Sequence, residues 1–258
     1  MKPKLLTYSY FPGVTAFSTT RHGGVSQGTF GEFNINEYCG DDEAHIAANR
    51  EALAQELGIA SMCIVMPHQV HGVECRVVDK SLLSLPEADR HARLEGVDCV
   101  MTKEKGLCVG VSTADCIPVL LFDPTRNAVA AVHAGWRGTL CGISRKAVGE
   151  MALHFGSLPE ELLAVVGPGI SLKNFEVGQE VYDQFAEAGY DMNAIARHYA
   201  KWHLNLPLCN ELQLRQAGLQ ARNIHQSGIC TWDSVDDFFS ARRLGQQSGR
   251  IFTAALLK

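Results

Sequence analysis

A cysteine and a histidine stand 17 residues apart near the middle of the chain, each beside a short apolar run. Cys116 directly precedes the run 117–122, and His133 directly follows the run 128–132. Apolar runs of this length predict neighbouring strands that are buried on both faces. Because the segment between the runs is too short for a helical crossover, we expect an antiparallel hairpin. Its open end would hold Cys116 and His133 together, within reach of one ion or substrate.

A thiolate and imidazoles are typical ligands of catalytic zinc, which has three protein ligands and one open position. Cys116 and His133 would supply two of these ligands, and another histidine must supply the third. His68 and His71 flank a predicted turn at a strand end, and local geometry favours His71 over His68. The alternative is that both are ordinary loop residues, with Cys116 a buried structural thiol and His133 a hydrogen-bonded core histidine.

The segment from Arg21 to Asn34 has four glycines among its fourteen residues. Such a segment must be a loop, and its backbone can approach a ligand closely. Arg21 beside the glycines favours a loop that contacts an anion. An ordinary surface turn is the alternative.

The bulk composition excludes several classes of protein. A net charge of -5 and an isoelectric point near 6.0 give no reason to expect nucleic acid or an anionic membrane as a partner. No apolar stretch is long enough for a spanning helix, and the N-terminal region lacks the pattern of a signal peptide. Nine irregularly spaced cysteines indicate reduced thiols and a cytoplasmic protein. No feature of the sequence indicates an oligomeric state.

The hydrophobic pattern favours a fold of class α/β (α+β), a single domain over residues 1–258 with mixed β-sheets flanked by helices. Strands are predicted, in chain order, at 5–10, 14–19, 62–66, 72–78, 98–102, 107–112, 117–122, 128–132, 162–166, 224–229, 238–241 and 251–257. Helices are predicted at 43–57, 140–155, 178–188 and 208–219. Asp41 or Asp42 should cap the first helix and Gly58 should end it, while the polar segment 80–93 is expected to be a flexible excursion.

Several blocks of the sequence resemble the signatures of the laccase-domain family, also called YfiH-type polyphenol oxidases. The most specific are His71-Gly72, Thr113-Ala-Asp-Cys116 with Pro118, and Val132-His-Ala-Gly-Trp-Arg-Gly138. Further matches follow in family order and cover nearly the whole chain: 18–26 with Asn34, 167–170, 175–178, 230–231 and 238–243.

The resemblance implies a YfiH-like domain and a metal and catalytic site made of His71, Cys116 and His133, usually holding zinc. It also implies purine-nucleoside chemistry: phosphorolysis of adenosine, inosine, guanosine or methylthioadenosine, and hydrolytic deamination of adenosine. Purine nucleosides and phosphate would therefore be the partners. The chain departs from the family in having His68 where relatives commonly carry an acidic residue, and Cys99 where a small residue is more common.

This chemistry assigns candidate roles to further residues. Deamination needs a carboxylate that moves a proton, and Asp98 and Asp115 are the candidates. Phosphorolysis needs a group that binds a dianion, and a guanidinium does so through two parallel hydrogen bonds. The arginine candidates are Arg21, Arg137 and Arg243, of which Arg137 is the strongest because it lies four residues after His133. The candidate substrate-binding residues are Arg21, Asn34, Asp98, Arg137 and Arg243.

The same residues are also consistent with three other functions. Two histidines and a cysteine also describe a blue-copper centre, so the site could hold copper and the protein could be a laccase-like polyphenol oxidase. Against a multicopper enzyme, the chain has no His-x-His pair. Without a metal, Cys116 and His133 could act as the nucleophile and base of a hydrolase. The fourth function is a non-enzymatic nucleoside-binding module.

Overall fold

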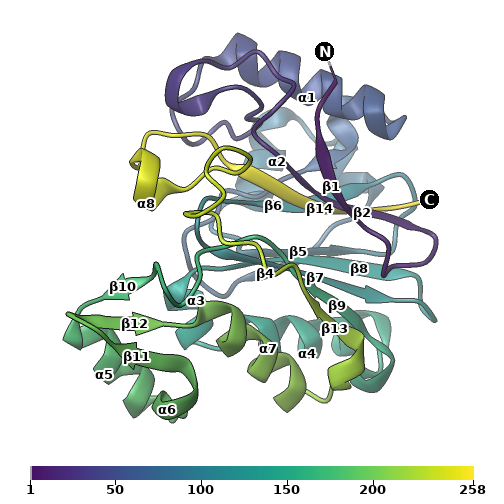
Figure 1. The fold of residues 1–258 in the computed structure, drawn as a ribbon. Coiled ribbons are helices and arrows are strands. Elements are labelled where there is room, and N and C mark those ends of the chain that lie inside the picture. The colour runs from purple at the N-terminus through teal and green to yellow at the C-terminus, as the bar shows by residue number, and fades with distance from the viewer. Residues whose placement is uncertain (1) are drawn as a thin grey trace.

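Two β-sheets pack face to face in a computed structural model, which describes residues 2–258 (Figure 1). Val109 of one sheet packs with Leu120 and Val129 of the other in the core between them. Helices cover the outer face of each sheet, so that four layers result. The expected mixed α/β architecture is confirmed.

The first sheet has five strands in the order β1-β2-β14-β6-β3. All of its pairs are antiparallel except β3 with β6. Its strands are β1 (Leu5–Tyr8), β2 (Val14–Thr19), β14 (Ile251–Leu257), β6 (Cys108–Thr113) and β3 (Ile64–Val65).

The second sheet has six strands in the order β13-β9-β7-β8-β5-β4, with parallel pairs only at its two edges. Its strands are β13 (Ile224–Gln226), β9 (Leu163–Val166), β7 (Ile117–Asp123), β8 (Ala128–Ala134), β5 (Cys99–Thr102) and β4 (Cys75–Val77). A small antiparallel sheet lies to one side and was not expected from the sequence; it consists of β10 (Glu176–Val177), β12 (Trp202–Leu204) and β11 (Ala196–His198).

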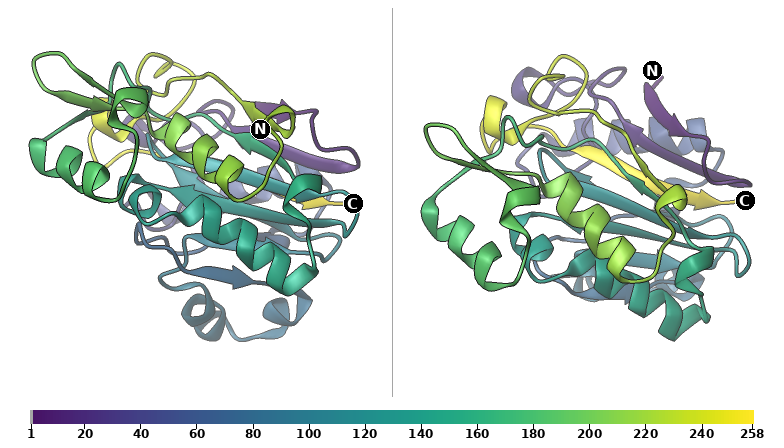
Figure 2. Two further views of the ribbon diagram at one scale, coloured as in Figure 1. Left: turned by 90° about the horizontal axis from the view of Figure 1, so that it is seen from below. Right: turned by 60° about the horizontal axis from the view of Figure 1, so that its bottom comes forward.

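The helices fall into two groups. On the five-stranded sheet, Leu53 of α1 packs against Phe17 and Phe252. Beneath the six-stranded sheet, α4 and α7 lie side by side (Figure 2). The helices are α1 (Glu43–Leu57), α2 (Glu87–Leu94), α3 (Trp136–Leu140), α4 (Ile143–Phe155), α5 (Gln179–Glu187), α6 (Met192–Ile195), α7 (Leu206–Gln216) and α8 (Ala241–Leu244).

Among residues 2–258, no helix combines the length and the apolar character needed to cross a membrane.

The predicted hairpin is formed by β7 and β8, which pair antiparallel with Pro118 opposite His133. Every residue of both strands is buried. Alternate residues of β8 face opposite layers: Val129 and Ala131 face the five-stranded sheet, whereas Val132 faces the helices. By this alternation His133 points into the space between the two sheets, at the end of the strand.

Three predictions about elements were wrong. The segment 80–93 is not an excursion, because Leu82 and Leu94 are buried and anchor a 3-10 turn and α2. The predicted strand 238–241 is instead an irregular segment that leads into α8, with the Ser240 side chain accepting from the backbone N–H of Arg243. The predicted helix 140–155 is divided into α3 and α4 at Gly142, whose φ is +78°.

Of the two candidate caps of α1, Asp42 is the N-cap, and its side chain accepts from two backbone N–H groups.

Two glycines should respond in opposite ways to substitution by alanine. A Cβ on Gly110, in β6, would lie 2.4 Å from Cζ of Phe252 and 2.6 Å from Cβ of Ala254. Gly110→Ala should therefore lower the free energy of unfolding by about 1–3 kcal/mol, the usual cost of overpacking a core. A Cβ on Gly149, in α4, would meet nothing within 4 Å, so Gly149→Ala should raise the same quantity by about 0.5–1 kcal/mol. Urea unfolding of both variants checks this, and equal stabilities would contradict the packing described.

Candidate metal centre

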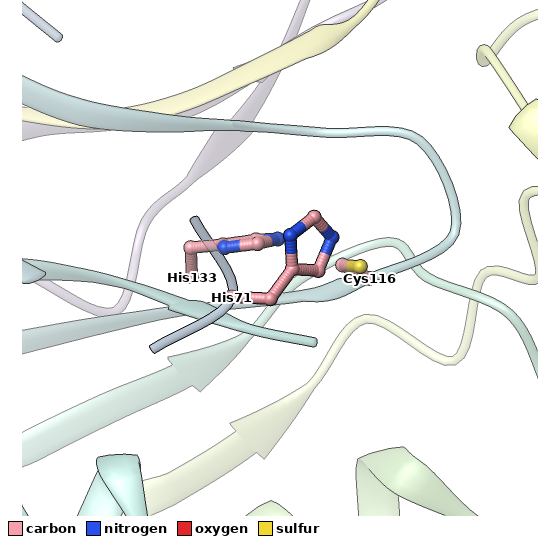
Figure 3. A group of neighbouring side chains, drawn as sticks. All are labelled: His71, Cys116 and His133. Carbon is pink, nitrogen blue, oxygen red and sulfur yellow. The ribbon is translucent and has the colours of Figure 1, made fainter. Parts of the chain in front are cut away.

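Three side chains from separate segments converge at the end of the central hairpin (Figure 3). His71 comes from the turn before β4, Cys116 precedes β7, and His133 lies in β8. One ligand atom from each of the three residues lies within 4.8 Å of the others. The imidazole rings of His71 and His133 are 4.7 Å apart between centroids and inclined by 77°. The structure thus brings together the three residues that the sequence analysis selected, and His68 is not part of the cluster.

A buried carboxylate, that of Asp98, joins two of these residues. It accepts a hydrogen bond from Nδ1 of His133 at 2.7 Å. It also accepts from the backbone N–H groups of Val70, His71 and Gly72, at 3.3, 3.0 and 2.7 Å. Burial alone would raise the pKa of Asp98, but the hydrogen bond and charge of His133 outweigh it and lower the pKa. Because Nδ1 of His133 faces Asp98, Nε2 is the atom left for a metal.

Asp115 plays a similar part on the other side of the cluster. Its Oδ1 accepts from the hydroxyl of Thr231 at 2.7 Å, and its Oδ2 accepts from the backbone N–H of Arg242 at 2.6 Å. These bonds tie the residue before Cys116 to the C-terminal segment.

Backbone strain is concentrated at this centre. Within residues 2–258, three non-glycine residues have a positive φ, and two of them are His71 at +63° and Asp115 at +90°. Such conformations cost free energy and persist where the surroundings impose them. Here the hydrogen bonds to Asp98 and from Thr231 do so.

Close packing explains a glycine of the most specific signature block. A Cβ on Gly135 would lie 2.7 Å from Cδ2 of His71 and 3.2 Å from Sγ of Cys116. Any side chain at this position would therefore displace two of the three clustered residues.

The thiol and the buried imidazole change each other's charge. Burial alone would raise the pKa of Cys116, but the positive charge and hydrogen bond of His133 lower it to about 6. Burial alone would lower the pKa of His133, whereas the Cys116 thiolate and Asp98 raise it. Without a metal, these shifts favour a thiolate beside an imidazolium, and metal binding would release the proton on Nε2 of His133.

The donor set fits a zinc ion. Zinc binds thiolate sulfur and imidazole nitrogen, and a metal-bound imidazole usually donates its other N–H to a carboxylate or carbonyl. His71, Cys116 and His133 supply the donors, and Asp98 supplies the carboxylate.

The cluster lines a cavity of about 450 Å³, the size of a small-molecule site. Two aromatic rings in its wall each have one face covered: Tyr38 stacks on His68 at 4.2 Å between centroids, and the guanidinium of Arg137 lies over Trp136. The lining residues are Asn36, Tyr38, Cys39, His68, Gln69, His71, Ser112, Thr113, Ala114, Asp115, Cys116, His133, Trp136, Arg137, Ala241, Arg242, Gln246 and Arg250.

The other candidate residues are divided between the cavity and its surroundings. Arg137 and Asp115 line the cavity. Asp98 is not part of the lining, and its carboxylate oxygens accept hydrogen bonds from His133 and from the backbone of residues 70–72. Arg243 lies outside the cavity lining and donates to the carbonyl of Trp232.

Arg21 and Asn34 also lie outside the cavity lining, and both brace loops. Arg21 donates to the carbonyls of Gly31 and Val235. Asn34 is fully buried and donates to Asp41. Side-chain hydrogen bonds therefore hold the glycine-rich segment in place. Neither Arg21 nor Asn34 contacts the cavity.

Sequence reasoning missed two cations of the cavity, Arg242 and Arg250. The signature block 238–243 contained a signal for the first, but its neighbour Arg243 was selected. Which of two consecutive arginines faces the cavity depends on α8, where a strand had been predicted.

The chain is similar to named proteins over nearly its whole length. A purine nucleoside phosphorylase from Bacteroides thetaiotaomicron is 38% identical over 252 residues, which cover 96% of this chain and 93% of the relative. Adenosine deaminase RL5, from an unknown prokaryotic organism, is 40% identical and covers 95% of each chain.

Two solved structures have the same fold over nearly their full lengths. The crystal structure of YlmD from Geobacillus stearothermophilus matches with a TM-score of 0.90 and 31% identity, covering 97% of this chain and 94% of that one. The Bacillus licheniformis hypothetical protein YfiH matches with a TM-score of 0.90 and 30% identity, covering 99% and 97%. The family model described as multi-copper polyphenol oxidoreductase laccase matches residues 15–258, and the chain therefore belongs to this laccase-like, YfiH-type family.

Proposed function

We propose that the protein is a zinc-dependent purine nucleoside phosphorylase that also deaminates adenosine. Adenosine, inosine, guanosine and methylthioadenosine are the proposed nucleosides. The observation that carries this proposal is the convergence of His71, Cys116 and His133 in the wall of a cavity large enough for a small molecule. The names of the relatives, purine nucleoside phosphorylase and adenosine deaminase, support it.

The two reactions differ in the nucleophile. In phosphorolysis, a phosphate oxygen bonds to C1′ of the ribose while the bond from C1′ to N9 breaks and its electron pair leaves with the purine. In deamination, a water oxygen bonds to C6 and the amino group leaves as ammonia. A zinc ion, when bound, would supply a Lewis acid and activate water at neutral pH.

The protein's own residues would then orient and charge the site. Asp98 holds His133 with Nε2 toward the cluster and keeps His71 in its strained turn. Of the two candidate carboxylates, Asp115 lines the cavity, and we assign it the movement of a proton to or from the purine. Tyr38 and Trp136 place aromatic rings in the cavity wall, and we assign them the contacts with the purine base.

The number of metal-ligand groups distinguishes a zinc enzyme from a multicopper oxidase. Within residues 2–258, one group of three or more His, Cys, Asp or Glu side chains could hold a metal ion, and it consists of His71, Cys116 and His133. A multicopper oxidase needs further groups for its other copper ions. We therefore favour one metal per chain, and elemental analysis distinguishes zinc from copper.

Replacing Cys116 should remove zinc and both activities together. Protein expressed without added copper should contain about one zinc per chain, since three ligands and one open position are typical of a catalytic zinc site. Inosine should release hypoxanthine only when phosphate is present, and Cys116→Ala should abolish this release, adenosine deamination and the zinc. Chromatography of a purine-nucleoside panel, with metal quantified on the same samples, measures all three.

The matched control is Cys141→Ala, which removes an exposed thiol outside the cavity lining and should leave zinc and both activities unchanged. Full activity in Cys116→Ala would show that the site is wrong. One tightly bound copper with phenol oxidation and no phosphorolysis would favour the oxidase.

A second candidate function, a metal-free cysteine hydrolase, is favoured by one observation. His133 lowers the pKa of Cys116 and Cys116 raises that of His133, which favours an ion pair like that of enzymes that use cysteine as a nucleophile. A covalent adduct on Cys116 during turnover of metal-free protein would support this candidate over the metalloenzyme.

The lowered pKa of Cys116 predicts its reactivity as a function of pH. In chelator-treated protein, Cys116 should be alkylated by iodoacetamide at a rate that rises through pH about 6 and is near its plateau at pH 7. The sign follows because only the thiolate reacts, and a lowered pKa extends the thiolate to lower pH. Mass spectrometry of the alkylated peptides measures the rate, with the exposed Cys141 as internal reference. A rate that rises only near pH 9 would contradict the ion pair, and added zinc should protect Cys116.

A further inference from the structure

We propose that Arg137 and Arg242 together form the subsite that binds the phosphate nucleophile. This inference rests on the proposed function, and it adds a residue that sequence reasoning did not select. It follows from the charge of the cavity, from the hydrogen-bond donors that each arginine has free, and from the way each guanidinium is held.

The cavity wall carries an excess of positive charge. Three arginines line it, Arg137, Arg242 and Arg250, against the single carboxylate of Asp115. Both oxygens of Asp115 already accept hydrogen bonds within the protein. A cavity charged in this way favours an anionic ligand beside the neutral nucleoside.

The guanidinium of Arg137 has all its donors free. Its Cζ lies 4.4 Å from the centroid of the Trp136 ring. Within residues 2–258 it takes part in no hydrogen bond and no ion pair. A cation–π contact fixes the position of the planar group without using its N–H donors, so that these can donate two parallel hydrogen bonds to two oxygens of a phosphate.

Arg242 is held in the same manner. Its Cζ lies 5.4 Å from the ring centroid of Phe175, and its Nη1 donates to the carbonyl of Glu176 at 3.0 Å. No other guanidinium donor of Arg242 is used within residues 2–258. Its backbone N–H donates to Asp115, the residue before Cys116, so the arginine is positioned relative to the metal centre.

Arg250, the third arginine of the wall, is committed to the protein. Its Nη1 donates to the carbonyls of Ser248 and Gly249, and its Nη2 donates to the carbonyl of Gln246. These bonds hold the segment before β14 and leave few donors for a ligand. Arg250 therefore braces the loop, whereas Arg137 and Arg242 face the cavity with free donors.

The test uses the two reactions of one enzyme, because phosphorolysis needs phosphate and deamination does not. Arg242→Gln should raise the KM for inorganic phosphate about 10- to 100-fold, the expected effect of losing hydrogen bonds to a charged group. The kcat/KM for adenosine deamination without phosphate should stay within about twofold of wild type, since the substitution keeps the backbone N–H that positions Asp115. Arg242→Lys keeps the charge but loses the fork, and its phosphate KM should be intermediate.

Two further variants are controls. Arg215→Gln removes a guanidinium outside the cavity that is paired with Glu211, and the phosphate KM should not change. Arg243→Gln decides between the neighbouring arginines: a rise in phosphate KM for this variant and not for Arg242→Gln would overturn the inference. Zinc content, measured for every variant, should equal that of wild type.

The outcomes separate the two proposals. If wild-type protein releases no base in response to phosphate, the proposed function fails and the subsite fails with it. If wild type responds to phosphate and Arg242→Gln has the wild-type phosphate KM, only the subsite is wrong. If deamination and phosphorolysis fall in parallel in Arg242→Gln, the residue supports the cavity as a whole and the inference is also overturned.

Discussion

The centre depends on the carboxylate of Asp98, which is buried between the two sheets and joins segments far apart in the sequence. It accepts from the imidazole of His133 and from three consecutive backbone N–H groups around His71. A buried carboxylate is stable only when it is fully hydrogen-bonded. The same bonds that satisfy Asp98 therefore impose the strained turn at His71 and the tautomer of His133. Without this carboxylate, Nδ1 of His133 and the backbone N–H of His71 would both lose their hydrogen-bond partner.

Asp115 extends the same arrangement toward the C-terminal segment. Its carboxylate accepts from Thr231 and from the backbone of Arg242, while the next residue in the chain is Cys116. The side chain of Asp115 therefore fixes the position of Arg242, in the cavity wall, relative to Cys116. The strands β7 and β8 form the rigid part of the site. Asp98 and Asp115 attach the less regular segments that complete it.

The sequence allowed the hairpin and two of its ligands to be predicted, because the apolar period and the short connection determine antiparallel pairing between neighbours. It did not reveal the role of Asp98, since hydrogen bonds to residues 70–72 depend on tertiary contacts that no local pattern records. For the same reason Arg243 was preferred to Arg242. The segment 238–241 has apolar residues typical of a strand, yet Phe239 is buried in a local cluster and the chain turns into α8.

In the proposed metal centre, His71, Cys116 and His133 hold one metal ion that keeps an open position. X-ray absorption at the zinc edge of the purified protein measures this coordination. We expect the zinc to have one sulfur at about 2.3 Å and two imidazole nitrogens at about 2.0–2.1 Å, plus a light atom from solvent. A sulfur-free shell, or the same spectrum from Cys116→Ala, would contradict it.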